Sequence, residues 1–97
     1  ANRAEQMETN FFKANIEAAD ELARQLRLRN LSGIIIVDFI NMKKEEHNKE
    51  LLSFLSKRLK LDTVAASVID MTPLGLVEIT RKRNGKTLAE QIQGELK

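Results

Sequence analysis

A carboxylate at the end of an apolar run is the group in this chain with the clearest capacity for chemistry. Asp38 follows Gly33–Val37, a glycine with three isoleucines and a valine after it. Such a run is typical of a strand buried on both faces, and functional groups of α/β sheets gather beyond the carboxyl ends of strands. A carboxylate there is costly to desolvate unless it is hydrogen-bonded, paired or bound to a metal. Asp38 is therefore the leading candidate for a catalytic or metal-binding residue, and an N-cap or loop-closing aspartate is the alternative.

Asp70 and His47 are further candidates. Asp70 follows the apolar segment Val64–Ile69, so parallel pairing of the two strands would bring Asp38 and Asp70 to the same end of the sheet. Two carboxylates there can hold Mg²⁺, which takes oxygen ligands. Asp70 is equally suited to cap the turn before Pro73. His47 lies in the first turns of a polar helical segment and can serve as a general base or an RNA contact, although an isolated exposed histidine usually does neither.

A basic cluster near the C-terminus is the third feature of chemical interest. Arg81, Lys82, Arg83 and Lys86 can neutralise phosphates, and a solvated strand end explains the same residues equally well. No aromatic residue stands beside the cluster to stack on bases. The sequence has no glycine-rich phosphate loop, nucleophile elbow or histidine-based zinc spacing, which argues against the enzyme classes built on them.

Two helical patterns position these candidates. Apolar residues recur at three- and four-residue steps over Thr9–Leu28, and again over roughly Lys44–Leu61. Thr9, Asn10 and Asn15 are alternative N-caps of the first helix, Asn30 suits a left-handed cap at its end, and Asp20 with Arg24 forms an expected surface pair. The expected buried positions are Phe12, Ile16, Ala19, Leu22, Ala23 and Leu26 in the first helix, and Leu51, Leu52, Phe54, Leu55 and Leu59 in the second.

The order of elements predicts a small mixed sheet. A strand at Ile34–Phe39, the second helix and a strand at Val64–Ile69 make a right-handed crossover with parallel strands, a βαβ unit with the first strand central. Leu76–Thr80 is expected to be a third strand, antiparallel to the second across the turn at 72–75, and Leu88–Leu96 is compatible with a short terminal helix. The predicted class is α/β, with the two long helices packed on the sheet.

Composition limits the remaining possibilities. The 97 residues form one α/β domain or subdomain, 1–97, and the absence of cysteine excludes disulfides and thiolate metal sites. A net charge of +2 permits an anionic partner without requiring one. No segment is apolar enough to span a membrane and none resembles a signal peptide, so we expect a cytoplasmic protein without a membrane partner. The chain starts at Ala1 rather than Met, as expected of a piece of a longer protein.

Three blocks of the sequence resemble one known family. The segment Ile16–Leu31, IEAADELARQLRLRNL, looks like the signature helix of the RNase E/G family of bacterial endoribonucleases, and it runs directly into Gly33–Ile40 as the family pattern does. Leu74–Arg83 resembles a later block of the family at a matching distance, and His47 falls where the family commonly has a histidine. The likeness covers roughly Asn15–Leu88, which is most of the chain.

The resemblance implies a specific activity. Members of this family hydrolyse internal phosphodiesters of single-stranded RNA with a Mg²⁺ held by two aspartates in a subdomain similar to DNase I. One aspartate matches Asp38, and the other belongs to an Asp-x-Asn motif that would lie upstream of Ala1. The N-terminal RNA-binding domain would also lie outside this chain, as would a downstream cysteine pair that some members use to share zinc between subunits. A homo-oligomer of the parent protein is compatible with this likeness.

The chain also departs from the family pattern. Asn41 stands where an acidic residue is usual, Pro73 where a charged or polar residue is commoner, and Ala14 where a threonine often precedes the asparagine. Asp70 has no counterpart in the family. The resulting hypothesis is a fragment of a Mg²⁺-dependent endoribonuclease of RNA processing or decay, inactive alone. The alternative is a non-catalytic α/β module that binds RNA or docks to protein.

Overall fold

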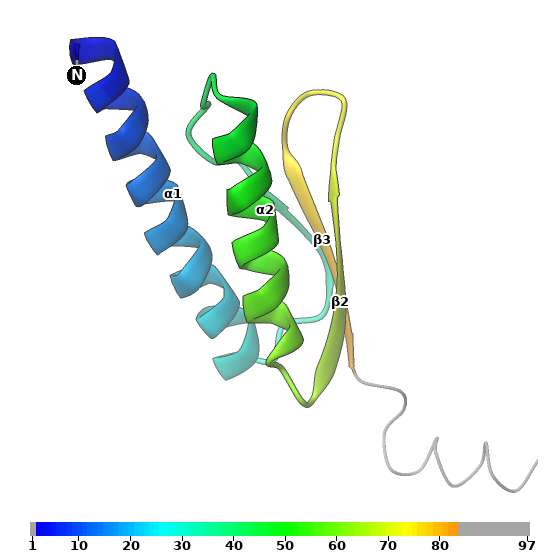
Figure 1. The fold of residues 1–97 in the computed structure, drawn as a ribbon. Helices are drawn as coiled ribbons and strands as arrows, with labels where there is room; N and C mark the ends of the chain where they lie inside the picture. Colours follow the sequence, from blue (N-terminus) through cyan, green and yellow to red (C-terminus); the bar gives the residue numbers. More distant parts are fainter. Residues whose placement is uncertain (1, 84–97) are drawn as a thin grey trace, which may run out of the picture.

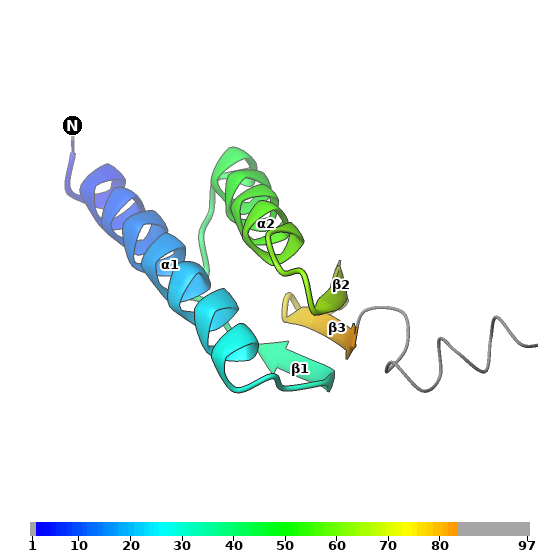
Figure 2. The same cartoon turned by 90° about the horizontal axis from the view of Figure 1, so that it is seen from below.

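The fold is a layer of helices on one face of a three-stranded sheet. A computed structural model describes residues 2–83 of the chain. The elements in chain order are α1 (Arg3–Leu28), β1 (Gly33–Val37), α2 (Glu45–Lys60), β2 (Ala65–Met71) and β3 (Val77–Arg83). Both helices lie on the same side of the sheet (Figure 1), with α1 towards β1 and α2 towards β2 (Figure 2). The expected helix at 88–96 lies outside the described residues.

Helix α1 begins earlier than the sequence pattern predicted. Its N-cap is Asn2, whose side chain accepts a hydrogen bond from the backbone N–H of Glu5 at 2.8 Å. The three caps proposed from the sequence are therefore wrong, and the Thr9 hydroxyl donates to the Glu5 carbonyl inside the helix at 3.0 Å. The first turns carry few apolar residues, so periodicity could not find them, although most of their residues are good helix formers. At the other end, Asn30 has φ +49°, which confirms the left-handed position after the helix.

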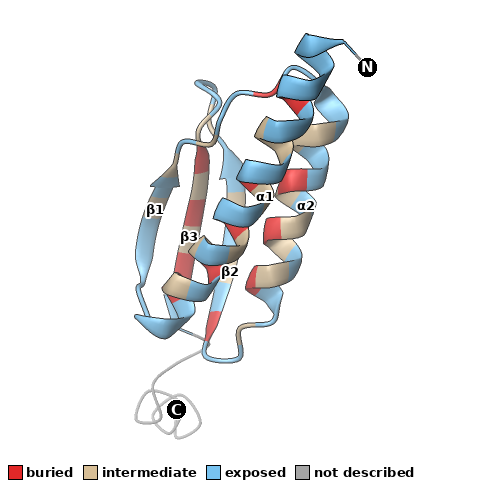
Figure 3. Ribbon diagram, turned by 90° about the vertical axis from the view of Figure 1, so that its left-hand side faces the viewer, coloured by how far each residue is buried: buried red, intermediate tan, exposed pale blue. Residues whose placement is uncertain are grey.

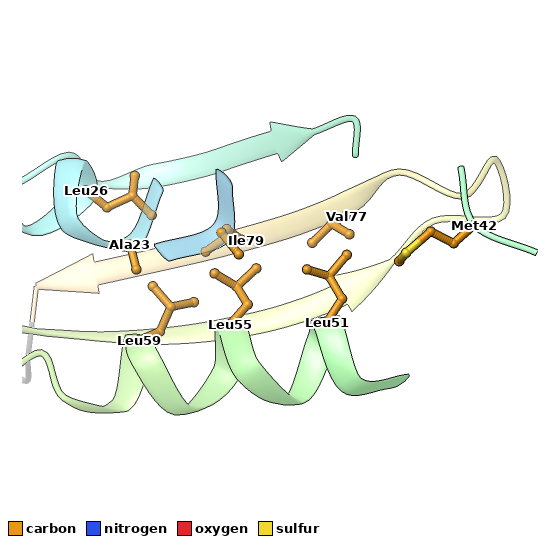
Figure 4. Close-up of a cluster of buried hydrophobic side chains, with 9 residues drawn as sticks. Ala23, Leu26, Met42, Leu51, Leu55, Leu59, Val77 and Ile79 are labelled. Atoms are coloured by element: carbon orange, nitrogen blue, oxygen red, sulfur yellow. The ribbon is translucent and has the colours of Figure 1, made fainter. Parts of the chain in front are cut away.

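The apolar stripes of the two helices meet over the sheet, as predicted. Each stripe position named from the sequence is buried or packs against the buried cluster. Leu55 and Ile79 at the centre are fully buried, and Figure 4 shows the leucines of α2 directed at β3. The buried apolar residues of this core are Ala19, Ala23, Leu26, Met42, Leu51, Leu55, Leu59, Val77 and Ile79. The helix periodicity of the sequence therefore located the core correctly.

The sheet topology differs from the prediction. The strand order is β1-β3-β2, and β3 is antiparallel to both of its neighbours. The antiparallel β2–β3 hairpin is confirmed, and so is its turn, in which the Gly75 N–H donates to the Thr72 carbonyl at 2.9 Å. The parallel βαβ pairing is wrong, because β3 occupies the place beside β2 that was assigned to β1. β1 and β2 still run in the same direction, with β3 between them.

Among the described residues, strand β1 is at the edge of the sheet and is covered on one face only. Ile34 is 68% exposed and Ile36 is 52% exposed, whereas the alternate residues Ile35 and Val37 pack against the core. Figure 3 shows β1 mostly exposed beside the buried positions of β3. The prediction of a central strand buried on both faces is therefore wrong. An apolar β-branched run predicts a strand, but it does not determine whether a second layer covers the strand.

Adjacent isoleucines in β1 provide a matched test of this arrangement. Ile35→Ala should cost about 1–2 kcal/mol more in unfolding free energy than Ile36→Ala, since only the first removes buried methyl groups. Both substitutions lose the same β-branched preference, so the difference reports burial. Urea unfolding of the two variants supplies the measurement. Equal losses at both positions would mean that β1 is covered on both faces and that this orientation is wrong.

Candidate functional site

Asp38 lies immediately after β1, at the end of the sheet where β3 begins. Its side chain is exposed, and within residues 2–83 its carboxylate has no hydrogen-bond or ion-pair partner. Helix α2 starts only at Glu45 and its N-cap residue is Lys44, so Asp38 does not cap it. The carboxylate is therefore free to bind an external ligand, and the N-cap alternative is wrong.

A side chain of α1 holds the backbone just beyond Asp38. Asn15 is 2% exposed, and its Nδ2 donates to the Ile40 carbonyl at 2.8 Å. The Ile40 N–H donates in return to Asn15 Oδ1 at 2.9 Å. One side-chain amide thus pairs with both polar groups of a single backbone residue. Asn15 was expected to be an N-cap, and no local pattern in the sequence indicates this contact.

A second residue of α1 fixes the end of the same connection. Glu8 is buried, and its two carboxylate oxygens accept the backbone N–H groups of Lys43 and Lys44 at 3.0 and 3.1 Å. His47 Nδ1 lies 2.9 Å from Glu8 Oε2. The bond from Lys43, followed by those from His47 and Lys44, outweighs the effect of burial and lowers the pKa of Glu8 to about 2. Glu8 is therefore ionised at neutral pH and anchors the start of α2.

His47 occupies this anchor rather than an exposed helix face. Its ring stacks on that of Phe12, with the ring centroids 4.5 Å apart. If Nδ1 is the protonated nitrogen, it donates to the Glu8 carboxylate. Nearby, Asn48 Nδ2 donates to the Met42 carbonyl at 3.2 Å. The observed partners of His47 are structural ones, and they join α1 to α2 without involving Asp38.

Asp70 is at the same end of the sheet as Asp38 but not beside it. The register places Asp70 opposite Glu78 on β3, and Glu78 opposite Ile36 on β1. Two strand spacings of about 4.8 Å put β1 and β2 roughly 10 Å apart, and Asp38 lies two residues beyond Ile36. With this stagger the two aspartates are too far apart for one Mg²⁺ to bind both directly. Residues 2–83 contain no group of three or more His, Cys, Asp or Glu side chains arranged for a metal ion. The pairing expected from parallel strands therefore does not form.

The basic cluster is divided by the alternation of β3. Arg81 points inward and is 0% exposed, so the structure corrects its assignment as an RNA contact. Lys82 and Arg83 are exposed and remain available, whereas Lys86 lies outside the described residues. A basic run in a strand sends alternate side chains to opposite faces, and this chain uses one of those positions for its interior.

Arg81 ties together the connections at the end of the sheet opposite Asp38. Its Nε and Nη2 donate to Asp62 Oδ2 at 3.0 and 2.7 Å, and its Nη1 donates to Asn30 Oδ1 and the Leu31 carbonyl at 3.1 and 2.6 Å. Burial alone would raise the pKa of Asp62, but the bonds from Arg81 and from the Val64 and Ala65 backbone lower it below its usual value. The pair is thus ionised and joins β3 to the turns that follow α1 and α2.

A surface ion pair also links the helices. Arg58 on α2 donates from Nε to Asp20 Oδ1 on α1 at 2.6 Å, and its Nη2 contacts the same oxygen. The expected Asp20–Arg24 pair is therefore wrong, and Arg24 instead lies 3.6 Å from Glu21.

Neither described helix is long and apolar enough to cross a membrane.

Comparison with known proteins identifies relatives for most of the chain. The model of the Ribonuclease E/G family matches residues 1–84. Ribonuclease G of Salmonella typhimurium is 46% identical over 89 residues, which cover 92% of this chain and 18% of that protein. A Ribonuclease E/G-like protein of Pyropia yezoensis is 43% identical over 83 residues (86% and 16%), and Ribonuclease E of a Nostoc species is 47% identical over 76 residues (78% and 11%). The chain spans less than a fifth of the length of these relatives.

The structural role of Arg81 can be tested against its neighbour Lys82. Arg81→Met should cost about 3 kcal/mol or more in unfolding free energy, because it leaves the Asp62 carboxylate buried without its partner. Lys82→Met should change stability by at most about 0.5 kcal/mol. Removing both charges, as in Arg81→Met with Asp62→Leu, should recover part of the loss. Equal effects of the two single substitutions in urea unfolding would contradict the assignment of Arg81 to the interior.

Glu8 should make stability depend on acid pH. Its folded pKa of about 2 lies below the ordinary 4.5, so its contribution is complete above about pH 4.5 and is lost as pH falls towards 2. Glu8→Gln should lower the melting temperature by a few degrees at pH 7, and the gap from wild type should close over that range. Glu17→Gln, an exposed change on the same helix, is the matched control. A gap that stays constant from pH 7 to pH 2 would rule out the ionised Glu8 as its cause.

Proposed function

The chain belongs to the Ribonuclease E/G family, and on that basis we propose that it is part of a Mg²⁺-dependent endoribonuclease. The parent protein would hydrolyse internal phosphodiester bonds of single-stranded RNA, with Asp38 as a ligand of the metal. The observation that carries this proposal is the free carboxylate of Asp38, exposed at the end of β1 and followed by a connection that α1 holds in place.

The donor chemistry of Asp38 fits Mg²⁺, but only as part of a site. Carboxylate oxygens are hard ligands, and those of Asp38 have no competing partner within residues 2–83. One carboxylate is a weak site for Mg²⁺, which keeps most of its waters and requires near-octahedral geometry.

The cavity that includes Phe39 and Ile40 has a volume of about 120 Å³. This is small for a nucleotide, since ligand pockets usually exceed about 300 Å³.

The position of β1 supports a second ligand from elsewhere in the parent protein. Within residues 2–83, β1 has β3 on one side only, so in this part of the chain its other edge has free backbone groups next to Asp38. A further strand paired there would lie about 4.8 Å from β1, half the distance of β2. We propose that this place belongs to a segment upstream of Ala1 with the second acidic ligand. The isolated 97-residue chain would then be inactive.

In this proposal the residues of the chain have separate roles. A bound Mg²⁺ would supply activated water and neutralise the charge that develops on the phosphate. Asp38 binds through its carboxylate oxygens, and the bonds to Ile40, Lys43 and Lys44 keep the following backbone fixed. Lys82 and Arg83 attract the phosphate backbone weakly and without reading sequence.

Substitution of Asp38 in the parent enzyme tests the proposal. Asp38→Asn should lower kcat/KM for single-stranded RNA at saturating Mg²⁺ about 100-fold or more, since it removes a charged metal ligand. The melting temperature should stay within a few degrees, because the carboxylate is exposed and unpartnered in the described structure. Asp70→Asn, an exposed aspartate at the same end of the sheet, is the matched control and should cleave normally.

Two outcomes would contradict parts of this proposal. Wild-type cleavage by the Asp38→Asn parent would remove Asp38 from the mechanism. It would favour the alternative that this chain is a non-catalytic RNA-binding or docking part of the parent. Multiple-turnover cleavage by the 97-residue chain, lost on Asp38→Asn, would show that the site is complete within these residues. The proposed upstream ligand would then be wrong, even though the activity was right.

A further inference from the structure

We propose that Asn15 is a positioning residue for Asp38. Its side-chain amide fixes the backbone of Ile40 and thereby the direction in which the chain leaves β1. The inference rests on the proposed function of Asp38, and it adds a residue of α1 that would never touch metal or RNA.

The placement of Asn15 in α1 is unusual for a polar side chain. It lies one turn before Ala19, in line with the buried stripe that continues through Ala23 and Leu26. An apolar residue at this place would extend the stripe without the cost of burying an amide. Both polar ends of the amide are instead used on Ile40, at 2.8 and 2.9 Å. A buried amide satisfied by one distant backbone residue fixes a geometry that apolar packing leaves less defined.

The spacing of hydrogen-bonded backbone positions along the connection from β1 to α2 explains how Asn15 influences the position of Asp38. Val37 is held by its pairing with Val77, and Ile40 is held by Asn15, so only 38–39 lie between two fixed points. Without Asn15 the next hydrogen-bonded backbone is that of Met42, which accepts from Asn48, and the free stretch grows to 38–41. Phe39 still packs against the core, but an apolar contact has no directional preference. Metal ligands need placement within about 0.5 Å, so this difference matters for catalysis.

Three variants and one control separate positioning from simple stability. Asn15→Leu keeps the branched shape and completes the apolar stripe while it removes both bonds to Ile40. Asn15→Asp keeps the acceptor for the Ile40 N–H and places an oxygen against the Ile40 carbonyl. Leu59→Ala opens a cavity near the C-terminal end of α2, away from the connection that precedes this helix, and lowers global stability only. Asn10→Asp makes the same charge change at an exposed site on α1 and is the control.

The first measurement uses NMR of the ¹⁵N-labelled 97-residue chain. Asn15→Leu should raise amide exchange at Ile40 about tenfold or more relative to Ile79, because it removes the bond from the Ile40 N–H, whereas Asn15→Asp keeps that acceptor and should raise the exchange less. Both Asn15 variants should also lower the heteronuclear NOE of Asp38. Leu59→Ala should speed exchange of the core amides without changing the NOE of Asp38, and Asn10→Asp should change neither. If Asn15→Leu fails to fold, the Asp38 NOE of Asn15→Asp, which loses the bond to the Ile40 carbonyl, decides the result.

The second measurement uses the full-length parent enzyme. The Asn15 variants should lower kcat and raise the Mg²⁺ concentration for half-maximal cleavage, with KM for RNA unchanged, whereas Leu59→Ala should leave all three as in wild type at a temperature where it is folded. An unchanged Asp38 NOE, or equal effects of Leu59→Ala, would overturn the proposal for Asn15 even if Asp38→Asn is inactive. Wild-type activity of Asp38→Asn would instead remove the proposed function, and the positioning role of Asn15 in catalysis with it.

Discussion

The contact between α1 and the connection from β1 to α2 is the constraint on which the candidate site depends. Within residues 2–83 this connection has no regular backbone pairing, and α1 supplies partners for Ile40, Lys43 and Lys44 through Asn15 and Glu8. A helix that packed by apolar contacts alone could slide or rotate slightly on the sheet. These bonds set the register of α1 against β1 and α2, so the same contacts that orient the helix also fix the backbone after Asp38.

The parts of this fold that sequence could predict are those governed by local periodicity. Both apolar helix stripes, the β2–β3 hairpin and the left-handed Asn30 follow from spacing and turn chemistry within a few residues. The position of β1 does not. Ile34–Val37 reads the same whether one face is covered or two, and the order β1-β3-β2 depends on which side of β2 the hairpin folds. That choice is made by packing between distant segments, which a single sequence does not encode in any local pattern.

The site residues also differ in whether a local sequence pattern could indicate them. Asp38 was singled out because a carboxylate after an apolar strand is conspicuous, although its exposure removes the desolvation cost on which that argument rested. Asn15 and Glu8 were missed because their partners lie more than twenty residues away, and Arg81 was misassigned because neighbouring cations concealed its inward position. One signal was present: a polar residue in line with a helix's apolar stripe must find a buried partner. Asn15 satisfies that condition. Arg81 alternates in register with the buried Val77 and Ile79 along β3, and this pattern likewise indicates a side chain that points inward.

The two faces of the sheet differ in a way that bears on how the site would be completed. Helices cover the inner face, while the outer face carries Ile34 and Val68 on either side of Thr80, with both aliphatic side chains about two-thirds exposed. Exposed aliphatic side chains beside an unpaired strand edge are typical of a sheet that packs against further protein. Asp38 directly follows β1, the strand at that edge. On the inner side α1 holds the backbone of Ile40, two residues further along, so a segment that pairs with β1 would meet a carboxylate that lies between two hydrogen-bonded backbone positions.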